Sequence, residues 1–174
     1  VMDCDPGTDD ALALLMVAAA ENIELRAITT VAGNLDNEKT AYNALKIADY
    51  FGIDVPVGKG AYPILKEFEP LDVSICGVSG LGDAVLPEPK RKLDERPSVK
   101  ILCQEAVKAQ GELQILATGP LTNVALLIRE YPEVKGLIKR IVLMGGAVYG
   151  GNTTPKAEFN IYTDAEAAKI VFQS

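Results

Sequence analysis

The chain has 174 residues, of which 48% are hydrophobic and 24% are charged, and its formal net charge is −7. This length and composition are typical of one globular domain, and the acidic balance argues against nucleic acid and anionic membrane surfaces as partners. No apolar run reaches the roughly 20 residues that a membrane span needs, and no secretory signal is visible. We therefore expect one cytoplasmic domain over residues 1–174.

Apolar segments rich in valine, isoleucine and leucine alternate along the chain with segments of helical periodicity. They predict strands at residues 1–4, 25–31, 54–57, 113–117 and 139–144. They predict helices at residues 10–20, 38–51, 98–110, 121–129 and 165–172, with Ser98 and Asp164 as N-caps. Residues 59–97 are expected to form a long excursion, and loops of that size tend to be functional or mobile. The alternation predicts an α/β fold in which helices cover both faces of an open, mostly parallel sheet.

The polar and glycine-rich segments of the chain follow directly after predicted strands. These segments are residues 5–10, 32–34, 118–120 and 145–160. In an open α/β sheet, ligands bind beyond the carboxyl ends of the strands. We therefore expect the four segments to meet at one edge of the sheet and to form the functional site.

Four aspartates crowd the first of these segments, at positions 3, 5, 9 and 10. Two carboxylates about 4 Å apart repel each other by roughly 4 kcal/mol at an effective dielectric constant of about 20. Carboxylate and carbonyl oxygens are ligands that suit Mg²⁺ or Ca²⁺. The cluster therefore indicates a bound hard cation. The alternative is that one or two of these aspartates only cap the following helix.

Cysteine and histidine usage excludes several common kinds of site. The chain has no histidine, so it cannot supply a Ser-His-Asp triad or an H-E-x-x-H zinc site by itself. Its three cysteines, Cys4, Cys76 and Cys103, are odd in number and widely spaced, which argues against a disulfide framework and against a C-x-x-C zinc site. Reduced thiols are the expected state.

The remaining polar residues of these segments each allow two interpretations. Asn34 follows a glycine at a predicted strand end and is either a turn residue or a site residue. The carbonyl of Thr118 either turns outward to a metal or belongs to an ordinary strand-to-helix turn. Asn123 is most simply a residue in the first turn of a helix. A polar loop holds Asn152, Glu158, Phe159 and Asn160. That loop suits a polyhydroxylated ligand, and a solvated loop is the equal alternative.

Residues 3–11 read Asp-Cys-Asp-Pro-Gly-Thr-Asp-Asp-Ala, which closely resembles the amino-terminal signature of the inosine-uridine-preferring nucleoside hydrolases. The resemblance continues, in order, at residues 31–34, 117–123, 144–146 and 152–160. It implies the nucleoside hydrolase fold, an open α/β fold with a Rossmann-like core. Members of the family are longer, so we expect this chain to be the amino-terminal part of a larger catalytic domain. Its opening within a predicted strand and its stop just after a helix has begun agree with that expectation.

The resemblance implies calcium-dependent hydrolysis of the N-glycosidic bond of ribonucleosides to ribose and free nucleobase. It makes Asp5, Asp10 and the backbone carbonyl of Thr118 the calcium ligands, together with a further aspartate from beyond Ser174. It also makes Asp5 the general base toward a water at the calcium, with Asn34 close to that water and to the sugar. The substrate-binding residues that it implies are Asp9, Asn34, Met144, Asn152, Glu158, Phe159 and Asn160.

The resemblance also bears on the pocket for the nucleobase and on the assembly of the protein. Many relatives have a histidine where this chain has Cys76, which is either a thiol of the base pocket or a buried structural cysteine. The family further implies a homo-oligomer, either a dimer or a tetramer.

Two other functions stay open. One is a catalytically inactive ribonucleoside-binding protein. The other is an Asp-dependent Mg²⁺ phosphatase, whose signature needs threonine or valine where Gly7 stands.

Overall fold

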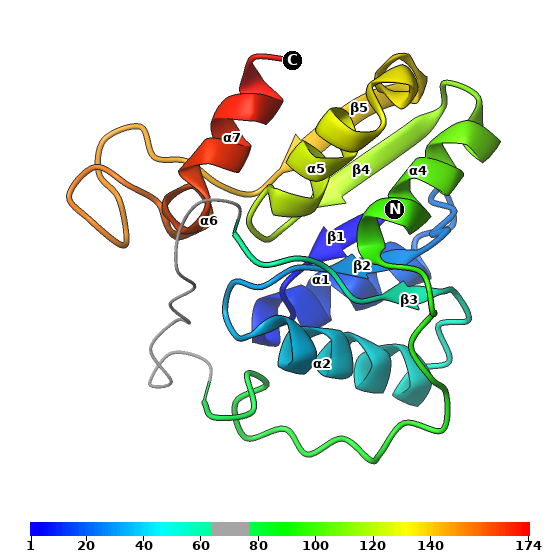
Figure 1. Cartoon of the computed structure of the whole chain (residues 1–174). Helices are drawn as coiled ribbons and strands as arrows, with labels where there is room; N and C mark the ends of the chain where they lie inside the picture. The colour runs from blue at the N-terminus through cyan, green and yellow to red at the C-terminus, as the bar shows by residue number, and fades with distance from the viewer. Residues whose placement is uncertain (64–76) are drawn as a thin grey trace.

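The computed structural model describes residues 1–63 and 77–174. Five strands form one open sheet: β1 (Met2–Cys4), β2 (Ile28–Thr30), β3 (Val57–Gly58), β4 (Leu113–Ala117) and β5 (Ile138–Leu143). The strands lie in the order β3-β2-β1-β4-β5, and every neighbouring pair is parallel. The predicted open parallel sheet is therefore confirmed (Figure 1).

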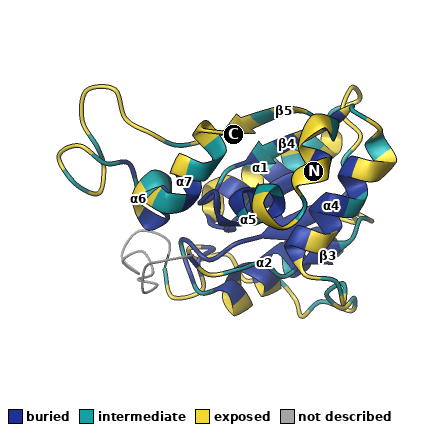
Figure 2. Ribbon diagram, turned by 45° about the horizontal axis from the view of Figure 1, so that its top comes forward, coloured by how far each residue is buried: buried dark blue, intermediate teal, exposed yellow. Residues whose placement is uncertain are grey.

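Helices cover both faces of this sheet. The described helices are α1 (Thr8–Ala19), α2 (Asn37–Tyr50), α4 (Ser98–Ala109), α5 (Thr122–Glu130), the 3-10 helix η1 (Pro132–Leu137), α6 (Phe159–Thr163) and α7 (Ala165–Phe172). Figure 1 shows α1 and α2 on one side of the sheet and α4 and α5 on the other. Ile115 and Leu116 illustrate the two layers: they belong to different core clusters because successive side chains of a strand point to opposite faces. Burial is accordingly concentrated along the sheet and the inner sides of its helices (Figure 2).

The order of the strands creates a switch point between β1 and β4. From β1 the chain proceeds outward through β2 and β3 on one side, and then through β4 and β5 on the other. The backbone N–H of Thr118 donates to the carbonyl of Asp3 at 2.9 Å, so the β1–β4 pairing continues to the ends of both strands. Ligands of open α/β sheets bind in the crevice outside the carboxyl ends at such a point. The fold therefore places the loops after β1 and β4 side by side.

Several helix ends differ from the sequence prediction. Ser98 is the first residue of α4 and does not cap it; its hydroxyl donates to the carbonyl of Gly58 at 2.9 Å and accepts from the backbone N–H of Thr30 at 3.2 Å. The N-cap prediction for Ser98 is therefore wrong, because the side chain joins two strands. Asp164 does cap α7, since its carboxylate accepts from the N–H of Ala167 at 3.0 Å. The helix α6 begins inside the stretch predicted as a loop, after Glu158 as its N-cap.

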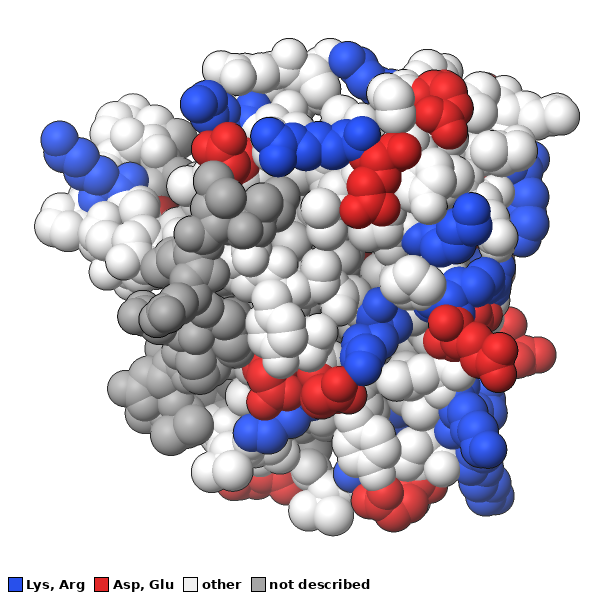
Figure 3. All heavy atoms as spheres, in the orientation of Figure 1, with Lys and Arg blue, Asp and Glu red and all other residues white. Residues whose placement is uncertain are grey.

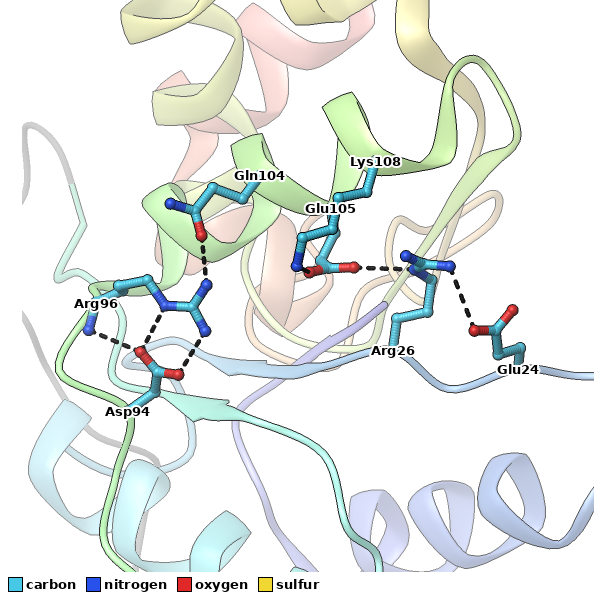
Figure 4. A network of polar contacts seen from close by, with 7 residues as sticks. All are labelled: Glu24, Arg26, Asp94, Arg96, Gln104, Glu105 and Lys108. Atoms are coloured by element: carbon cyan, nitrogen blue, oxygen red, sulfur yellow. Dashed lines mark hydrogen bonds and ion pairs between the residues drawn. The ribbon is translucent and has the colours of Figure 1, made fainter.

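Charged side chains tie the second half of α4 to two neighbouring segments (Figure 4). Glu105 is only 4% exposed and accepts from Nε of Arg26 at 2.9 Å, which ties the helix to the segment before β2. Nε of Arg96 donates to Oδ1 of Asp94 at 2.7 Å, and Arg96 also binds Gln104. Buried or multiply bonded pairs hold geometry better than single exposed ones. The network therefore anchors α4 to the segments on either side of it.

The surface carries charges of both signs. Lysine and arginine side chains lie among aspartate and glutamate side chains on the face shown in Figure 3. Such a mixed face offers no continuous positive stripe of the kind that binds nucleic acid. Among the helices within residues 1–63 and 77–174, none has the length and apolar character needed to cross a membrane.

Candidate active site

Asp5 lies directly after β1 and is almost fully buried, with 1% of its surface exposed. Its Oδ2 accepts a 2.7 Å hydrogen bond from the backbone N–H of Asn34. The side-chain amide of Asn34 donates in turn to the backbone carbonyl of Asp5 at 2.9 Å. Asn34 follows β2, whereas Asp5 follows the neighbouring strand β1. The loop after β2 therefore holds both the carboxylate and the backbone of Asp5. The structure thus brings together two residues expected at the site.

Two glycines leave room for the Asp5 carboxylate. A Cβ atom added to Gly33 would lie 2.1 Å from Oδ2 of Asp5, and one added to Gly119 would lie 2.5 Å from Oδ1. Real Cβ atoms do not approach oxygen this closely. The carboxylate is therefore enclosed by two backbone segments that only glycine can provide. Sequence reasoning did not assign a role to these glycines, although both lie in segments that carry the family resemblance.

Asp10 occupies the first turn of α1, as predicted, and is 4% exposed. Its Oδ1 accepts a 2.5 Å hydrogen bond from the hydroxyl of Thr118, and its Oδ2 accepts a 3.3 Å hydrogen bond from the backbone N–H of Gly7. Thr118 follows β4, so this contact joins α1 to the neighbouring strand end across the switch point. Asp10 and Thr118 were both expected as metal ligands, and the structure places them in direct contact.

Burial dominates the electrostatics of the two aspartates. It raises the pKa of Asp5 well above its usual range, the Asp10 carboxylate raises it further, and the hydrogen bond from Asn34 partly offsets both effects. Burial also raises the pKa of Asp10, with the Thr118 hydrogen bond acting against the rise and the Asp9 carboxylate adding to it. Neither Asp5 nor Asp10 forms an ion pair within the described part of the chain. The described residues thus leave this negative charge without a cationic side chain.

The groups at this point fit a hard divalent cation. They are two carboxylates and the Thr118 carbonyl, all oxygen donors of the kind that Ca²⁺ prefers. The Thr118 carbonyl accepts from the amide of Asn160 at 2.9 Å, and a carbonyl oxygen has a second lone pair that can bind a cation. Residues 1–63 and 77–174 contain no group of three or more His, Cys, Asp or Glu side chains able to hold a metal. A cation here would therefore take carbonyl or water oxygens beside the two aspartates.

Asn160 links the Thr118 carbonyl to the segment after β5. Its Nδ2 donates to Thr118 and also to the carbonyl of Met144 at 3.0 Å, and it lies 3.2 Å from the Met144 sulfur. The Met144 side chain is half exposed, at 53%. These contacts place two expected ribose-binding residues at the carbonyl of Thr118, whose hydroxyl binds Asp10.

Glu158 and Asn152 shape the polar loop around α6. The Glu158 carboxylate accepts from the backbone N–H groups of Asn160, Ile161 and Gly146, at 2.9, 3.1 and 3.0 Å. Oδ1 of Asn152 accepts from the backbone N–H of Phe159 at 2.8 Å. The loop is thus held by its own side chains, and the sequence alternative of a merely solvated loop does not describe the buried Glu158.

Asp9 and Cys76 are the remaining residues expected at the site. Asp9 lies in the first turn of α1 with its side chain exposed, and it is close enough to raise the pKa of both Asp5 and Asp10. That position would let it meet a ligand from the solvent side. Cys76 lies outside the described residues.

A buried polar network surrounds Asp3, and its contacts were not predicted from the sequence. Oδ1 of Asp3 accepts from the Thr29 hydroxyl at 2.6 Å and from Nδ2 of Asn123 at 2.8 Å. Burial raises the pKa of Asp3 to about 6, although these two hydrogen bonds oppose the rise. Asn123 also donates to the carbonyl of Thr30 at 2.6 Å. It does lie in the first turn of α5, as expected, yet its fully buried amide connects β1, β2 and α5.

Comparison with known proteins supports a common origin for this arrangement. The family model described as inosine-uridine preferring nucleoside hydrolase matches residues 1–174. Over 176 residues the chain is 45% identical to the pyrimidine-specific ribonucleoside hydrolase RihA of Salmonella typhimurium and 44% identical to that of Photobacterium profundum. Each match covers 100% of this chain and 56% of the relative.

The fold is similar to that of a solved structure as well. The purine-preferring ribonucleoside hydrolase from Gardnerella vaginalis superposes with a TM-score of 0.93 at 38% identity. The superposition covers 98% of this chain and 56% of that one. The chain therefore spans little more than half the length of the proteins that it matches.

Proposed function

Because the chain belongs to the inosine-uridine preferring nucleoside hydrolase family, we propose that the full-length protein hydrolyses the N-glycosidic bond of ribonucleosides, releasing ribose and a free nucleobase. One observation carries this proposal: Asp5 and Asp10 form a buried carboxylate pair at the switch point of the sheet. The similar proteins are named as ribonucleoside hydrolases, which favours this reaction over a phosphatase.

Calcium is part of the proposal. Asp5, Asp10 and the Thr118 carbonyl would hold the ion, since all three are oxygen donors gathered at adjoining strand ends. Bound there, the ion would lower the pKa of a coordinated water and so favour its deprotonation near neutral pH.

Asp5 would accept the proton of the attacking water. Proton transfer to a positioned side chain typically contributes about 10²- to 10⁴-fold to the rate of such a reaction. Asn34 and the two glycines fix the direction of this carboxylate, which lowers the entropic cost of reaching the reactive geometry. As the bond to the base breaks, positive charge develops on the ribose ring. Nearby carboxylates, including Asp9, would stabilise that charge.

The polar loop around α6 would hold the ribose. Asp9 would present acceptors to the sugar hydroxyls from the first turn of α1. Glu158 keeps one unused lone pair on Oε1, because each carboxylate oxygen can accept twice and Oε2 already does. The other residues proposed to contact the substrate are Asn34, Met144, Asn152, Phe159 and Asn160. Contacts of this kind orient the ring, and they raise the rate if they strengthen as the ring distorts.

The names of the similar proteins bear on which nucleobase the substrate carries. One relative is named for pyrimidine ribonucleosides and one similar structure for purine ones, so we propose ribonucleosides without choosing a base. We also propose that the full-length protein is a dimer or a tetramer, which light scattering coupled to size-exclusion chromatography would measure.

The direct test is a reducing-sugar assay of the full-length protein with inosine, uridine and cytidine. We expect ribose release from at least one of them, loss of the activity in a chelator and recovery when Ca²⁺ is returned. Absence of ribose release from all three would contradict the proposed reaction. Tight binding of a ribonucleoside without release would instead support the alternative of an inactive binding protein.

A further inference from the structure

Thr118 has each of its polar atoms bound to a different part of the molecule. Its backbone N–H donates to the carbonyl of Asp3 at 2.9 Å, and its carbonyl accepts from the amide of Asn160 at 2.9 Å. Its hydroxyl donates to Oδ1 of Asp10 at 2.5 Å, across 108 residues of chain. The residue therefore connects β1, α1 and α6 at one point.

The hydrogen bond from the Thr118 hydroxyl is the shorter of the two that the described residues donate to the Asp10 carboxylate. The other hydrogen bond to this carboxylate comes from the backbone N–H of Gly7 and is longer, at 3.3 Å. Together the two donors hold opposite oxygens and so fix the plane of the carboxylate. Without the hydroxyl, the hydrogen bond that remains to this carboxylate among the described residues would be the longer one from Gly7.

We infer that the Thr118 side chain is a positioning group for the proposed cation: its hydroxyl sets the orientation of Asp10 while its carbonyl supplies a ligand of its own. This inference rests on the proposed function. The family resemblance gives Thr118 only a backbone role, which any residue could fulfil. The structure adds a role for which a hydroxyl is required, and losing a group that orients a metal ligand typically weakens metal binding by about 10- to 100-fold.

Substitution at this position separates the two roles, because every variant keeps the carbonyl. Thr118→Val removes the hydroxyl at nearly constant volume, Thr118→Ala removes it with less bulk, and Thr118→Ser retains it. Calcium affinity of the full-length protein is measured by titration calorimetry, and thermal unfolding in chelator shows whether each metal-free variant is folded. We expect the valine and alanine variants to bind Ca²⁺ about 10- to 100-fold more weakly. The serine variant should bind close to wild type.

The outcomes distinguish the inference from the function on which it rests. If wild type binds Ca²⁺ and the hydroxyl-free variants bind it equally well, the inference is overturned while the proposed function stands. If the serine variant is weakened as much as the valine variant, the hydroxyl is not the cause and the inference also fails. If wild type itself binds no Ca²⁺, the cation of the proposed function is refuted, and the inference with it. Should the valine variant not fold in chelator, the alanine and serine pair decides.

Discussion

The backbone N–H of Asn34 donates a 2.7 Å hydrogen bond to Oδ2 of Asp5, and the Asn34 side chain donates a second bond to the carbonyl of the same residue. The two residues lie 29 positions apart and belong to loops that follow neighbouring strands. One residue thus fixes both the backbone and the carboxylate of the proposed general base.

Replacing Asn34 separates these two contacts. Asn34→Ala keeps the backbone N–H and removes the side-chain bond to the Asp5 carbonyl. We expect kcat for ribose release to fall by about 10- to 100-fold, as is typical when a group that orients a metal ligand is removed. The exposed Asn22 provides a matched control, since Asn22→Ala makes the same chemical change away from the site. Wild-type kcat in the Asn34 variant would show that this side chain is dispensable.

The glycines around Asp5 give a steric prediction. Gly33→Ala and Gly119→Ala each place a methyl group within 2.1 or 2.5 Å of an Asp5 oxygen, so the carboxylate or the loop has to move. A displacement of about 1 Å at a reacting group can reduce the rate by roughly 100-fold. We expect a loss of that size in kcat/KM for both variants.

Gly136 serves as the control for this pair, because a Cβ atom there meets nothing within 4 Å. Gly136→Ala should therefore leave ribose release close to wild type. Equal activity of the Gly33, Gly119 and Gly136 variants would refute the close packing around Asp5.

The buried network around Asp3 gives a stability prediction. Asn123→Ala removes the donor to Asp3 and to the Thr30 carbonyl, and it leaves both acceptors buried without that partner. Thr29 and Ser98 still donate to these acceptors, so we expect the lost hydrogen bonds themselves to cost about 3 kcal/mol of unfolding free energy. Urea denaturation in the presence of chelator, followed by circular dichroism, measures this loss apart from any metal effect. Asn22→Ala is again the control, and a loss no larger than the control's would contradict the structural role of Asn123.

The ion pair beside α4 gives a pH prediction. The hydrogen bond from Arg96, more than any other contact, lowers the pKa of Asp94 from 3.8 to about 2. The folded state therefore binds this proton more weakly than the unfolded state does. The stabilisation is present above pH 3.8 and disappears as the pH falls through about 2.

Asp94→Asn measures that contribution. Because the pair is partly open to solvent, we expect the variant to lose about 1 kcal/mol of unfolding free energy at neutral pH. The difference from wild type should shrink as the pH falls through the window in which the wild-type carboxylate takes up its proton. A difference that stays constant across that window would mean that the charge of Asp94 does not stabilise the fold.

Much of the fold could be predicted because the signals are local. Apolar segments and their periodicity gave five strands and the main helices, and alternation of the two gave a parallel sheet covered on both faces. The 3-10 helix η1 and the short helix α6 were not predicted. The carboxylate of Glu158 supplies the cap of α6 from a position that reads as loop.

The site could be predicted only in part because its contacts cross the chain. Placing polar loops after strands identified Asp5, Asp10, Asn34 and Thr118 as candidates. That Thr118 touches Asp10 depends on β4 lying beside β1, and strand order is set by the packing of whole layers. The close approaches of Gly33 and Gly119 and the strand-joining role of the Ser98 hydroxyl also depend on residues distant in sequence.

The measurement that tests the central claim most directly is single-turnover ribose release by the full-length Asp5→Asn variant. It is compared with wild type and with Asp54→Asn, which makes the same change at a side chain that is 98% exposed. If Asp5 is the general base beside the cation, its variant should lose at least about 100-fold in rate, while Asp54→Asn releases ribose like wild type. An Asp5→Asn variant that releases ribose at the wild-type rate would contradict the role of this carboxylate in the reaction.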